Sequence, residues 1–397
     1  MRLVGINRLL GRDGGLHLKR FFGGFLVLAL LAGCAPSPVE QEPITESIPE
    51  STPSPSVELS MFDAGCAALE DGTLTHSHLE VYRAILVDIC MDFEMNYELV
   101  DVAMSEKVDK DSAERYVDAN VFGLSYWNRY VDGGLAPLKI ILMTEEEKSW
   151  WAKQLKGELT LKPEWFGPTD GGGHCYAAEA EAFCTKAYYG MDKEVTGPSN
   201  ILTTMIGSKL QWTTFRRVVP IHEATHQFHS ATGLGNWRYW YIEGQATYFE
   251  MASSVLVSGL GGSNWRTEQA ELAATQDEIP FNAKTAKQAY EILKNCERSP
   301  NCQGMSYFGS SLAHELLVNT YGVEKYFAWN LALADRLPDF LWRETPSDEA
   351  TMRQGIDGFA KIFKKFFGKD IDEWERKEFA PYLLATYQCE VVKTKCS

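Results

Sequence analysis

The chain has 397 residues, which is long enough for one large or two modest domains with a full hydrophobic core. Its 45% hydrophobic and 23% charged residues are ordinary for a globular protein, and no internal repeat of about 20 to 50 residues indicates a solenoid. The formal net charge of -16 excludes nucleic acid as a partner and disfavours docking on anionic lipid, because an acidic surface repels phosphate groups. Any membrane attachment must therefore come from an anchor.

The first 33 residues have the pattern of an export signal. Basic residues up to Lys19-Arg20 precede an apolar run from Phe21 to Ala32. This run is too short to span a bilayer comfortably, but its length and position match the core of a signal peptide. We therefore predict a signal peptide over residues 1–33, with an uncleaved anchor as the alternative.

The signal ends in Leu31-Ala32-Gly33-Cys34, which resembles the lipobox of bacterial lipoproteins. In that motif small residues give a peptidase access to the backbone, and the cysteine thiol takes a lipid and becomes the mature N-terminus. The resemblance implies that Cys34 is lipidated and attaches the protein to a bacterial membrane. Because Ala35 rather than Asp follows, the sorting rule for such lipoproteins implies the outer membrane. A plain secretory signal with a chance cysteine is the alternative.

Residues 34–57 are rich in Pro, Ser, Glu and Thr and hold too few apolar side chains to form a core. We predict a lipid-anchored flexible linker in this segment, and an ordered extended arm is the alternative. The folded domain is then expected to comprise residues 58–397.

Eight further cysteines lie in four close pairs, which is typical of disulfides in an exported protein. The sequence alone does not fix their connectivity. We expect sequential pairing because closing a short loop costs the least chain entropy. A zinc site made of cysteines is the alternative, but no CxxC spacing favours it. The expected pairs are Cys66 with Cys90, Cys175 with Cys184, Cys296 with Cys302 and Cys389 with Cys396.

Regular elements are predicted from the start of the folded domain. Apolar residues recur at helical spacing over residues 74–105 and 111–131, which predicts helices there. Residues 138–143 have the sequence LKIILM and predict a strand. The segment Thr144-Glu145-Glu146-Glu147 has the pattern of a capping box, in which Thr and Glu side chains bond the free N–H groups at a helix start. It predicts a helix that continues to Leu155.

The pattern then changes toward helix. Residues 174–189 fit either a hairpin tied by their two cysteines or a helix, which their Ala and Glu content favours. From Thr213 to the end the spacing of apolar residues is mostly helical. We therefore predict an α+β fold, with a small mixed β-sheet in residues 58–235 and a mainly α-helical part in residues 236–397.

The segment His222-Glu223-Ala224-Thr225-His226 is an HExxH motif. On a helix, residues i and i+4 share one face, so the two imidazoles can hold one metal ion. A catalytic zinc ion takes three protein ligands and keeps one position open, and it lowers the pKa of water to about 7. Glu223 can then act as the general base for the zinc-activated water.

A third ligand is available downstream. Glu243 lies in the segment W-Y-I-E-G-Q-A-T-Y-F-E, residues 240–250, which predicts a second helix. Gly233 and Gly235 interrupt the chain between the motifs, so this helix can fold back onto the HExxH helix. The sequence therefore predicts a single Zn²⁺ held by His222, His226 and Glu243.

Together these motifs resemble those of the gluzincins, above all the peptidase MA-like group of bacterial zinc peptidases, and also the aminopeptidase-N family. The resemblance is tight over residues 215–255. It implies a zincin-like fold, with His222, His226 and Glu243 as zinc ligands and Glu223 as general base. The spacing of sixteen residues between His226 and Glu243 is shorter than in aminopeptidase N, and no G-x-M-E-N segment lies upstream. Aminopeptidase action is therefore not expected.

Two neighbouring residues, Glu250 and Tyr307, could support the chemistry. Thr247 stands where the family often has a carboxylate, so support for one histidine is expected from Glu250 instead. A tyrosine hydroxyl stabilises the oxyanion in related enzymes, and Tyr307 is the candidate here, with a core aromatic as the alternative.

The remaining candidates are weaker. His229 lies three residues past His226 and off the ligand face, so a structural or solvated role is expected. Tyr248 is expected to pack inward. The aromatic cluster from Trp237 to Tyr241 fits the core better than a substrate subsite. His314-Glu315 lacks a second histidine and is not a competing site.

The expected function is zinc-dependent hydrolysis of peptide bonds in the bacterial cell envelope, on a peptide or protein substrate. One alternative is a zinc hydrolase of amide crosslinks in the cell wall, which would use the same catalytic centre. The other is a tethered binding or assembly lipoprotein that keeps the metal for structure alone. The presence of Glu223 disfavours this last alternative, because a structural site needs no base.

Overall fold

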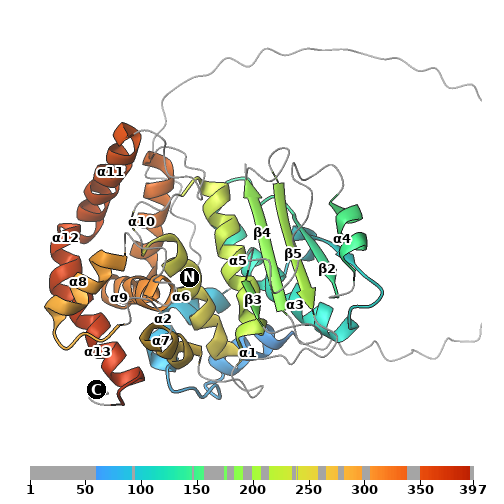
Figure 1. The fold of residues 1–397 in the computed structure, drawn as a ribbon, viewed down its shortest axis with the longest axis horizontal. Helices are drawn as coiled ribbons and strands as arrows, with labels where there is room; N and C mark the ends of the chain where they lie inside the picture. The colour runs from blue at the N-terminus through green and yellow to red at the C-terminus, as the bar shows by residue number, and fades with distance from the viewer. Residues whose placement is uncertain are drawn as a thin grey trace, which may run out of the picture. The chain divides into compact units, whose positions relative to one another are not determined.

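The computed structural model of this chain describes most of the predicted folded domain. The chain divides into two units, Met1–Ser56 and Val57–Ser397, and every described residue belongs to the second (Figure 1). The predicted signal peptide, Cys34 and the linker lie outside the described residues. Those residues are 60–91, 94–144, 147–155, 174–176, 183–190, 199–206, 214–234, 238, 240–257, 265–275, 281–296, 305–337 and 349–393.

A mixed sheet of five strands, in the order β1-β2-β5-β4-β3, forms one side of this unit. β1, β2 and β5 run parallel, whereas β4 is antiparallel to both β5 and β3. The predicted strand over residues 138–143 is confirmed as β2, which lies between β1 and β5 and is buried on both faces except at the half-buried Lys139, as its mostly apolar sequence requires. The strands are β1 (Val100–Met104), β2 (Leu138–Met143), β3 (His174–Tyr176), β4 (Phe183–Gly190) and β5 (Ser199–Ile206).

The two strands of the predicted hairpin are present at residues 174–176 and 183–190, so the helix alternative is wrong for these residues. β3 and β4 pair antiparallel, with Cys175 directly opposite Cys184 in the register. Residues 177–182, which hold most of the Ala and Glu of the segment, lie outside the described residues.

Four α-helices precede β3 in the described chain: α1 (Met61–Glu70), α2 (Leu79–Cys90), α3 (Lys110–Asn128) and α4 (Lys148–Gln154). The helix predicted over 74–105 is wrong beyond Cys90, because Val100–Met104 pairs with β2 as an edge strand. The helix predicted over 111–131 is confirmed as α3, with slightly shifted ends. The predicted capping box does not cap α4, because the N-cap of this helix is Glu147 and not Thr144. Thr144 still donates its backbone N–H to the Glu147 carboxylate at 3.1 Å, in the turn before the helix.

After Ile206 the regular elements in the described ranges are all helical, and no strand follows there. The predicted change from a mixed part to a helical part is therefore present. None of the helices in the described part of the chain is long and apolar enough to cross a membrane. The helices are α5 (Thr214–Thr232), α6 (Ile242–Leu256), α7 (Trp265–Thr275), α8 (Ala286–Cys296), the π-helical turn η5 (Met305–Gly309), α9 (Ser310–Tyr321), α10 (Val323–Arg336), α11 (Glu349–Phe367), α12 (Ile371–Trp374), the π-helical turn η6 (Glu375–Phe379) and α13 (Ala380–Glu390).

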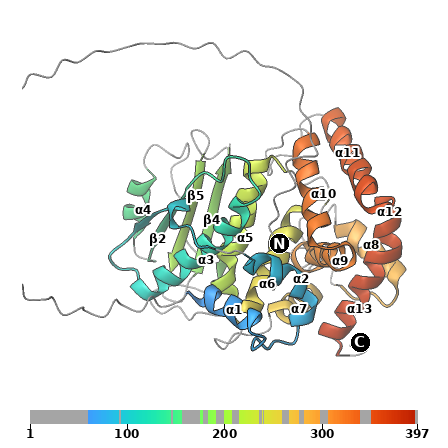
Figure 2. The same ribbon diagram turned by 180° about the vertical axis from the view of Figure 1, so that it is seen from behind.

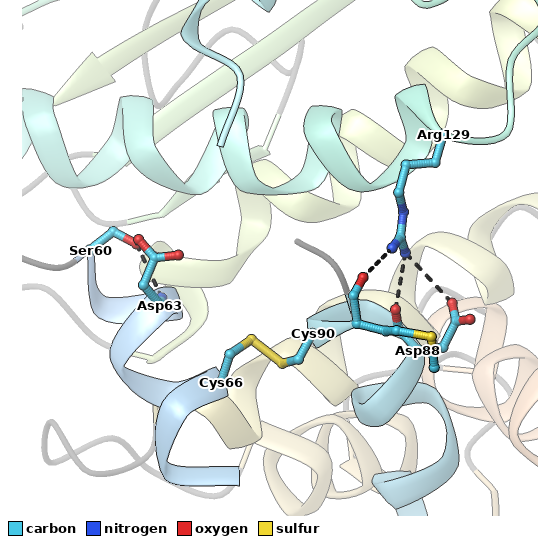
Figure 3. Close-up of a disulfide and its surroundings, with 7 residues drawn as sticks. Ser60, Asp63, Cys66, Asp88, Cys90 and Arg129 are labelled. Carbon is cyan, nitrogen blue, oxygen red and sulfur yellow. Dashed lines mark hydrogen bonds and ion pairs between the residues drawn. A yellow bond between two sulfur atoms is a disulfide. The ribbon is translucent and has the colours of Figure 1, made fainter. Parts of the chain in front are cut away.

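A disulfide between Cys66 and Cys90 joins α1 to α2 and confirms the first predicted pair (Figure 3). Arg129, at the end of α3, donates to the carbonyls of Asp88 and Met91 at the end of α2. A cation at this position suits the negative end of the helix dipole. Cys296 and Cys389 are disulfide-bonded as well, and their predicted partners lie outside the described residues.

A buried charge cluster ties the carboxy-terminal helix to the amino-terminal helices. Glu390 of α13 accepts from Arg266 Nε at 3.0 Å and from Thr267 at 2.7 Å, and it pairs with His78 at 2.7 Å. Arg266 also binds Glu315 of α9. Burial alone would raise the pKa of Glu390, but the hydrogen bonds and charges of His78, Arg266 and Thr267 lower it from 4.5 to about 2.

This shift predicts a pH-dependent contribution to stability. The folded-state pKa of Glu390 is depressed, so its stabilisation is present above pH 4.5 and is lost as the pH falls toward 2. We expect Glu390→Gln to lower the free energy of unfolding by about 2 to 3 kcal/mol at pH 7 and by progressively less below pH 4.5. Urea unfolding of both proteins between pH 7 and pH 3 measures this. A difference that stayed constant over that range would contradict it.

Candidate metal centre

Helix α5 carries the HExxH motif and lies between the sheet and the carboxy-terminal helices (Figures 1 and 2). Its packing against α3 is close, because a Cβ at Gly123 would lie 2.7 Å from the Ala224 side chain. The Trp127 indole N–H donates to the Thr225 hydroxyl at 2.9 Å across the same interface. The two variable positions of the motif are therefore used to hold α5 against α3, which leaves the histidines free to face α6.

Helix α6 supplies the third member of the site, at its first turn. A Cβ at Gly244 would lie 2.6 Å from the carbonyl carbon and oxygen of Ser310, so glycine is required for α9 to lie against α6. The close packing of α6 against α9 thus explains why a glycine follows Glu243. It sets the distance between α6, which carries Glu243, and the start of α9, which follows Tyr307.

Three predicted ligands come together here. The Nε2 atoms of His222 and His226 are 3.0 Å apart, and Oε2 of Glu243 lies 3.3 Å from the first and 3.5 Å from the second. A tetrahedral zinc ion with ligand atoms at about 2.0 to 2.1 Å places those atoms about 3.3 Å apart. The two nitrogens and the carboxylate oxygen therefore fit a zinc ion in both type and separation. No second group of three His, Cys, Asp or Glu residues with ligand spacing was found in the described ranges.

The triad is closed on one side and open on the other. His222 and His226 are only 5% and 3% exposed, whereas the Glu243 side chain is 31% exposed. Three protein ligands with solvent access at one edge are typical of a catalytic zinc site rather than a structural one, which has four protein ligands.

The charges of the site favour a cation between these residues. Burial alone would lower the pKa of His222, but hydrogen bonds to Glu243 and Glu250 raise it to about 10. Burial alone would likewise raise the pKa of Glu243, but His226 and His222 hold it well below its usual range. The carboxylates thus stabilise positive charge at the place where a metal ion would supply it.

Glu250 occupies the supporting position expected for it. Glu250 follows Glu243 on α6 and is 3% exposed. Its Oε2 lies 3.2 Å from Nδ1 of His222. A carboxylate that accepts from the outer nitrogen of a ligating histidine fixes the ring and makes it a stronger donor to the metal.

We expect Glu250→Gln to weaken zinc binding by about tenfold, because the amide keeps a hydrogen bond to His222 but loses the charge. Competition with a chromophoric zinc chelator measures the affinity. Glu271→Gln, an exposed change on α7, is the matched control and should bind zinc like the wild type. Equal affinities for the two variants would show that Glu250 does not support His222.

His229 is not solvated. It is fully buried, with Nδ1 3.3 Å from Nδ1 of His226 and Nε2 2.6 Å from Oε1 of Gln245. Burial, with the neighbouring His226, lowers the pKa of His229 well below its usual range. The structural alternative for His229 is therefore the correct one.

Glu223 and Tyr307 lie beside the triad. Glu223 is 5% exposed on α5 and makes no hydrogen bond or ion pair with the residues that the structure describes. Tyr307 is half-buried on the turn η5, and its ring centre is 5.8 Å from that of His222. The ring of Tyr307 is thus near His222, and Glu223 directly follows that ligand in the sequence.

The other aromatic candidates belong to the core. Tyr248 is fully buried, as expected. Trp240 and Tyr241 are fully buried as well, which favours the core alternative for their cluster, whereas Trp237 and Tyr239 lie outside the described residues. His314 bonds to Tyr326 rather than to a metal-binding group.

The residues that are hydrogen-bonded to His229 on the side away from His226 were not predicted from the sequence. Gln245, Tyr326 and Asn330 form a buried hydrogen-bonded group with His229, and they come from α6 and α10. The only signal in the sequence was that Gln245 follows Glu243 by two positions on the same predicted helix.

A scan against protein-family models and searches among curated proteins and solved structures found no match. The interpretation of this site therefore rests on its own residues and their geometry.

Proposed function

We propose that this protein is a zinc metallopeptidase with a zincin-like fold, in which α5 lies under the mixed sheet and faces the helical part. The observation that carries the proposal is the convergence of two imidazole nitrogens and a carboxylate oxygen at 3.0 to 3.5 Å beside Glu223. Glu223 directly follows the first ligand, His222, and makes no hydrogen bond or ion pair with the described residues. Its carboxylate therefore has no competing partner there.

The chain's own residues supply the acid–base steps. Bound zinc would act as a Lewis acid that polarises the attacked carbonyl and makes water acidic. Glu223 takes the proton from the attacking water and delivers it to the leaving amine. The Tyr307 hydroxyl donates to the oxygen on which negative charge develops. Glu250 holds the ring of His222 in place throughout.

The partial exposure of Glu243 supports a catalytic role over a purely structural metal site, because substrate needs access to an open position. The substrate is proposed to be a peptide or protein of the bacterial cell envelope. Lipidation at Cys34 would place the enzyme at the membrane, with the outer membrane as its proposed location.

The test is cleavage of a complex peptide library by residues 57–397, which form one compact unit. Products are identified by mass spectrometry in the presence of zinc, with Glu223→Ala beside the wild type. Cutting by the wild type alone supports the proposal, and the cut positions distinguish endopeptidase from exopeptidase action. If both proteins hold zinc and neither cuts, general peptidase activity is wrong, and amide crosslinks of the cell wall are the next substrate to assay.

A further inference from the structure

A chain of hydrogen-bonded side chains runs from the metal ligand His226 into the carboxy-terminal helices. His226 Nδ1 lies 3.3 Å from His229 Nδ1, and His229 Nε2 lies 2.6 Å from Gln245 Oε1. Gln245 Nε2 donates to the Tyr326 hydroxyl at 2.7 Å, and that hydroxyl lies 2.7 Å from Nδ1 of His314. All five side chains are at most 3% exposed, so water does not compete for these bonds.

The far end of the chain fixes the direction of every bond. Nε2 of His314 lies 2.9 Å and 3.2 Å from the backbone oxygens of Tyr241 and Trp240. Carbonyl oxygens only accept, so this nitrogen carries the proton. Burial lowers the pKa of His314 to about 3, so its ring is neutral and Nδ1 has a lone pair. The Tyr326 hydroxyl therefore donates to His314.

The orientation of the Gln245 amide follows from its neighbours. Because the Tyr326 hydrogen is used on His314, its oxygen accepts from Gln245 Nε2. The same nitrogen donates to Asn330 Oδ1 at 3.0 Å, and Asn330 is itself oriented because its Nδ2 donates to the Tyr326 carbonyl. Oε1 of Gln245 thus faces His229 as an acceptor, and His229 must carry its proton on Nε2.

The near end of the chain determines the state of the metal ligand. With its proton on Nε2, His229 presents a lone pair at Nδ1, so His226 donates from its own Nδ1. The Nε2 atom of His226 then has a lone pair, which points at His222 Nε2 and Glu243. The opposite arrangement would put a proton on the nitrogen that must bind the metal.

We propose that His229, Gln245, Tyr326 and His314 are positioning residues that hold His226 as the Nδ1–H tautomer and keep its Nε2 open for the metal ion. This inference rests on the metal site of the proposed function. It also assigns different supports to the two histidine ligands. His222 is hydrogen-bonded to the carboxylate of Glu250, whereas His226 is hydrogen-bonded to His229. His229 is in turn connected through Gln245 to residues of α9 and α10. Metal binding therefore depends on how these two helices pack behind α6.

The first test compares two amides at position 229 in the full-length protein, with zinc affinity measured by chelator competition. Asparagine can place its oxygen near the position of histidine Nδ1, whereas glutamine reaches the position of Nε2. We expect His229→Gln to weaken zinc binding by about ten- to 100-fold and His229→Asn by much less. Equal affinities for the two variants would overturn the proposal, provided that thermal unfolding shows both to be folded.

The second test acts at a distance and has a matched control. Tyr326→Phe removes the hydroxyl that orients Gln245 and that lies three hydrogen bonds away from His226. We expect this change to weaken zinc binding several-fold. Tyr126→Phe removes a buried hydroxyl that donates to Asp88 instead. It should lower thermal stability comparably and leave zinc affinity within twofold of the wild type. Wild-type affinity in Tyr326→Phe would overturn the proposal.

The third test reads the protons directly. The chain has only eight histidines, so ¹⁵N labelling of histidine gives ring spectra that can be assigned by substitution. We expect a proton on Nδ1 of His226 and on Nε2 of His229 in the zinc-loaded protein. A proton on Nδ1 of His229 would overturn the proposal. A wild type that binds no zinc would overturn this inference and the proposed function together, whereas zinc binding without peptide cleavage would overturn only the peptidase activity.

Discussion

Glu223→Gln is expected to bind zinc like the wild type and to hydrolyse peptides about 10²- to 10⁴-fold more slowly. The side chain is nearly isosteric, so the packing of α5 against α3 is kept. Glutamine cannot take a proton from water, however, and the leaving amine then has no donor. Because Glu223 makes no ion pair with the described residues, its replacement should leave the histidines undisturbed.

The measurement has two parts: zinc content after gel filtration, and the rate of cleavage of a peptide that the library identifies. Glu324→Gln, an exposed change on α10, is the matched control and should have wild-type values in both. A Glu223→Gln protein that retains zinc and cleaves at a rate near the wild type would remove Glu223 as the base. A protein that loses zinc would instead assign Glu223 to metal binding.

The part of the site that could be predicted is the part that depends on local spacing. The i and i+4 rule places His222 and His226 on one face of a helix, and a helix that folds back brings Glu243 to them. The strand β2 was predictable for the same reason, since five of its six residues are apolar, which suits a strand buried on both faces. These features need no knowledge of distant contacts.

What could not be predicted depends on contacts between distant parts of the chain. The spacing of apolar residues over 74–105 fits a helix, yet Val100–Met104 becomes a strand because β2 lies beside it. Gln245 and Tyr326 are 81 residues apart, and no local pattern indicates that they share a hydrogen bond. The sequence does not distinguish a structural from a solvated role for His229, because the burial of this residue depends on the same distant packing.

Glu243→Ala is expected to remove most of the zinc affinity, which is a larger effect than the tenfold loss at Glu250. A ligand atom is lost, and the two imidazoles that remain do not complete the three protein ligands of a catalytic site. Zinc at a concentration of 100 times its Kd should stabilise the wild type by about 2.7 kcal/mol, because it binds only the folded state. At the same zinc concentration the variant should gain well under 1 kcal/mol.

Thermal unfolding with and without zinc measures this gain, after the bound metal has been removed with a chelator. Glu324→Ala is the control, and it should gain as much from zinc as the wild type. Stabilisation of Glu243→Ala equal to that of the wild type would mean that another residue is the third ligand. In that case the helix with the E-G-x-A pattern would have no metal-binding role, and the resemblance to the gluzincins would reduce to the HExxH motif. Loss of the gain in Glu243→Ala alone would instead tie the two motifs to a single metal ion.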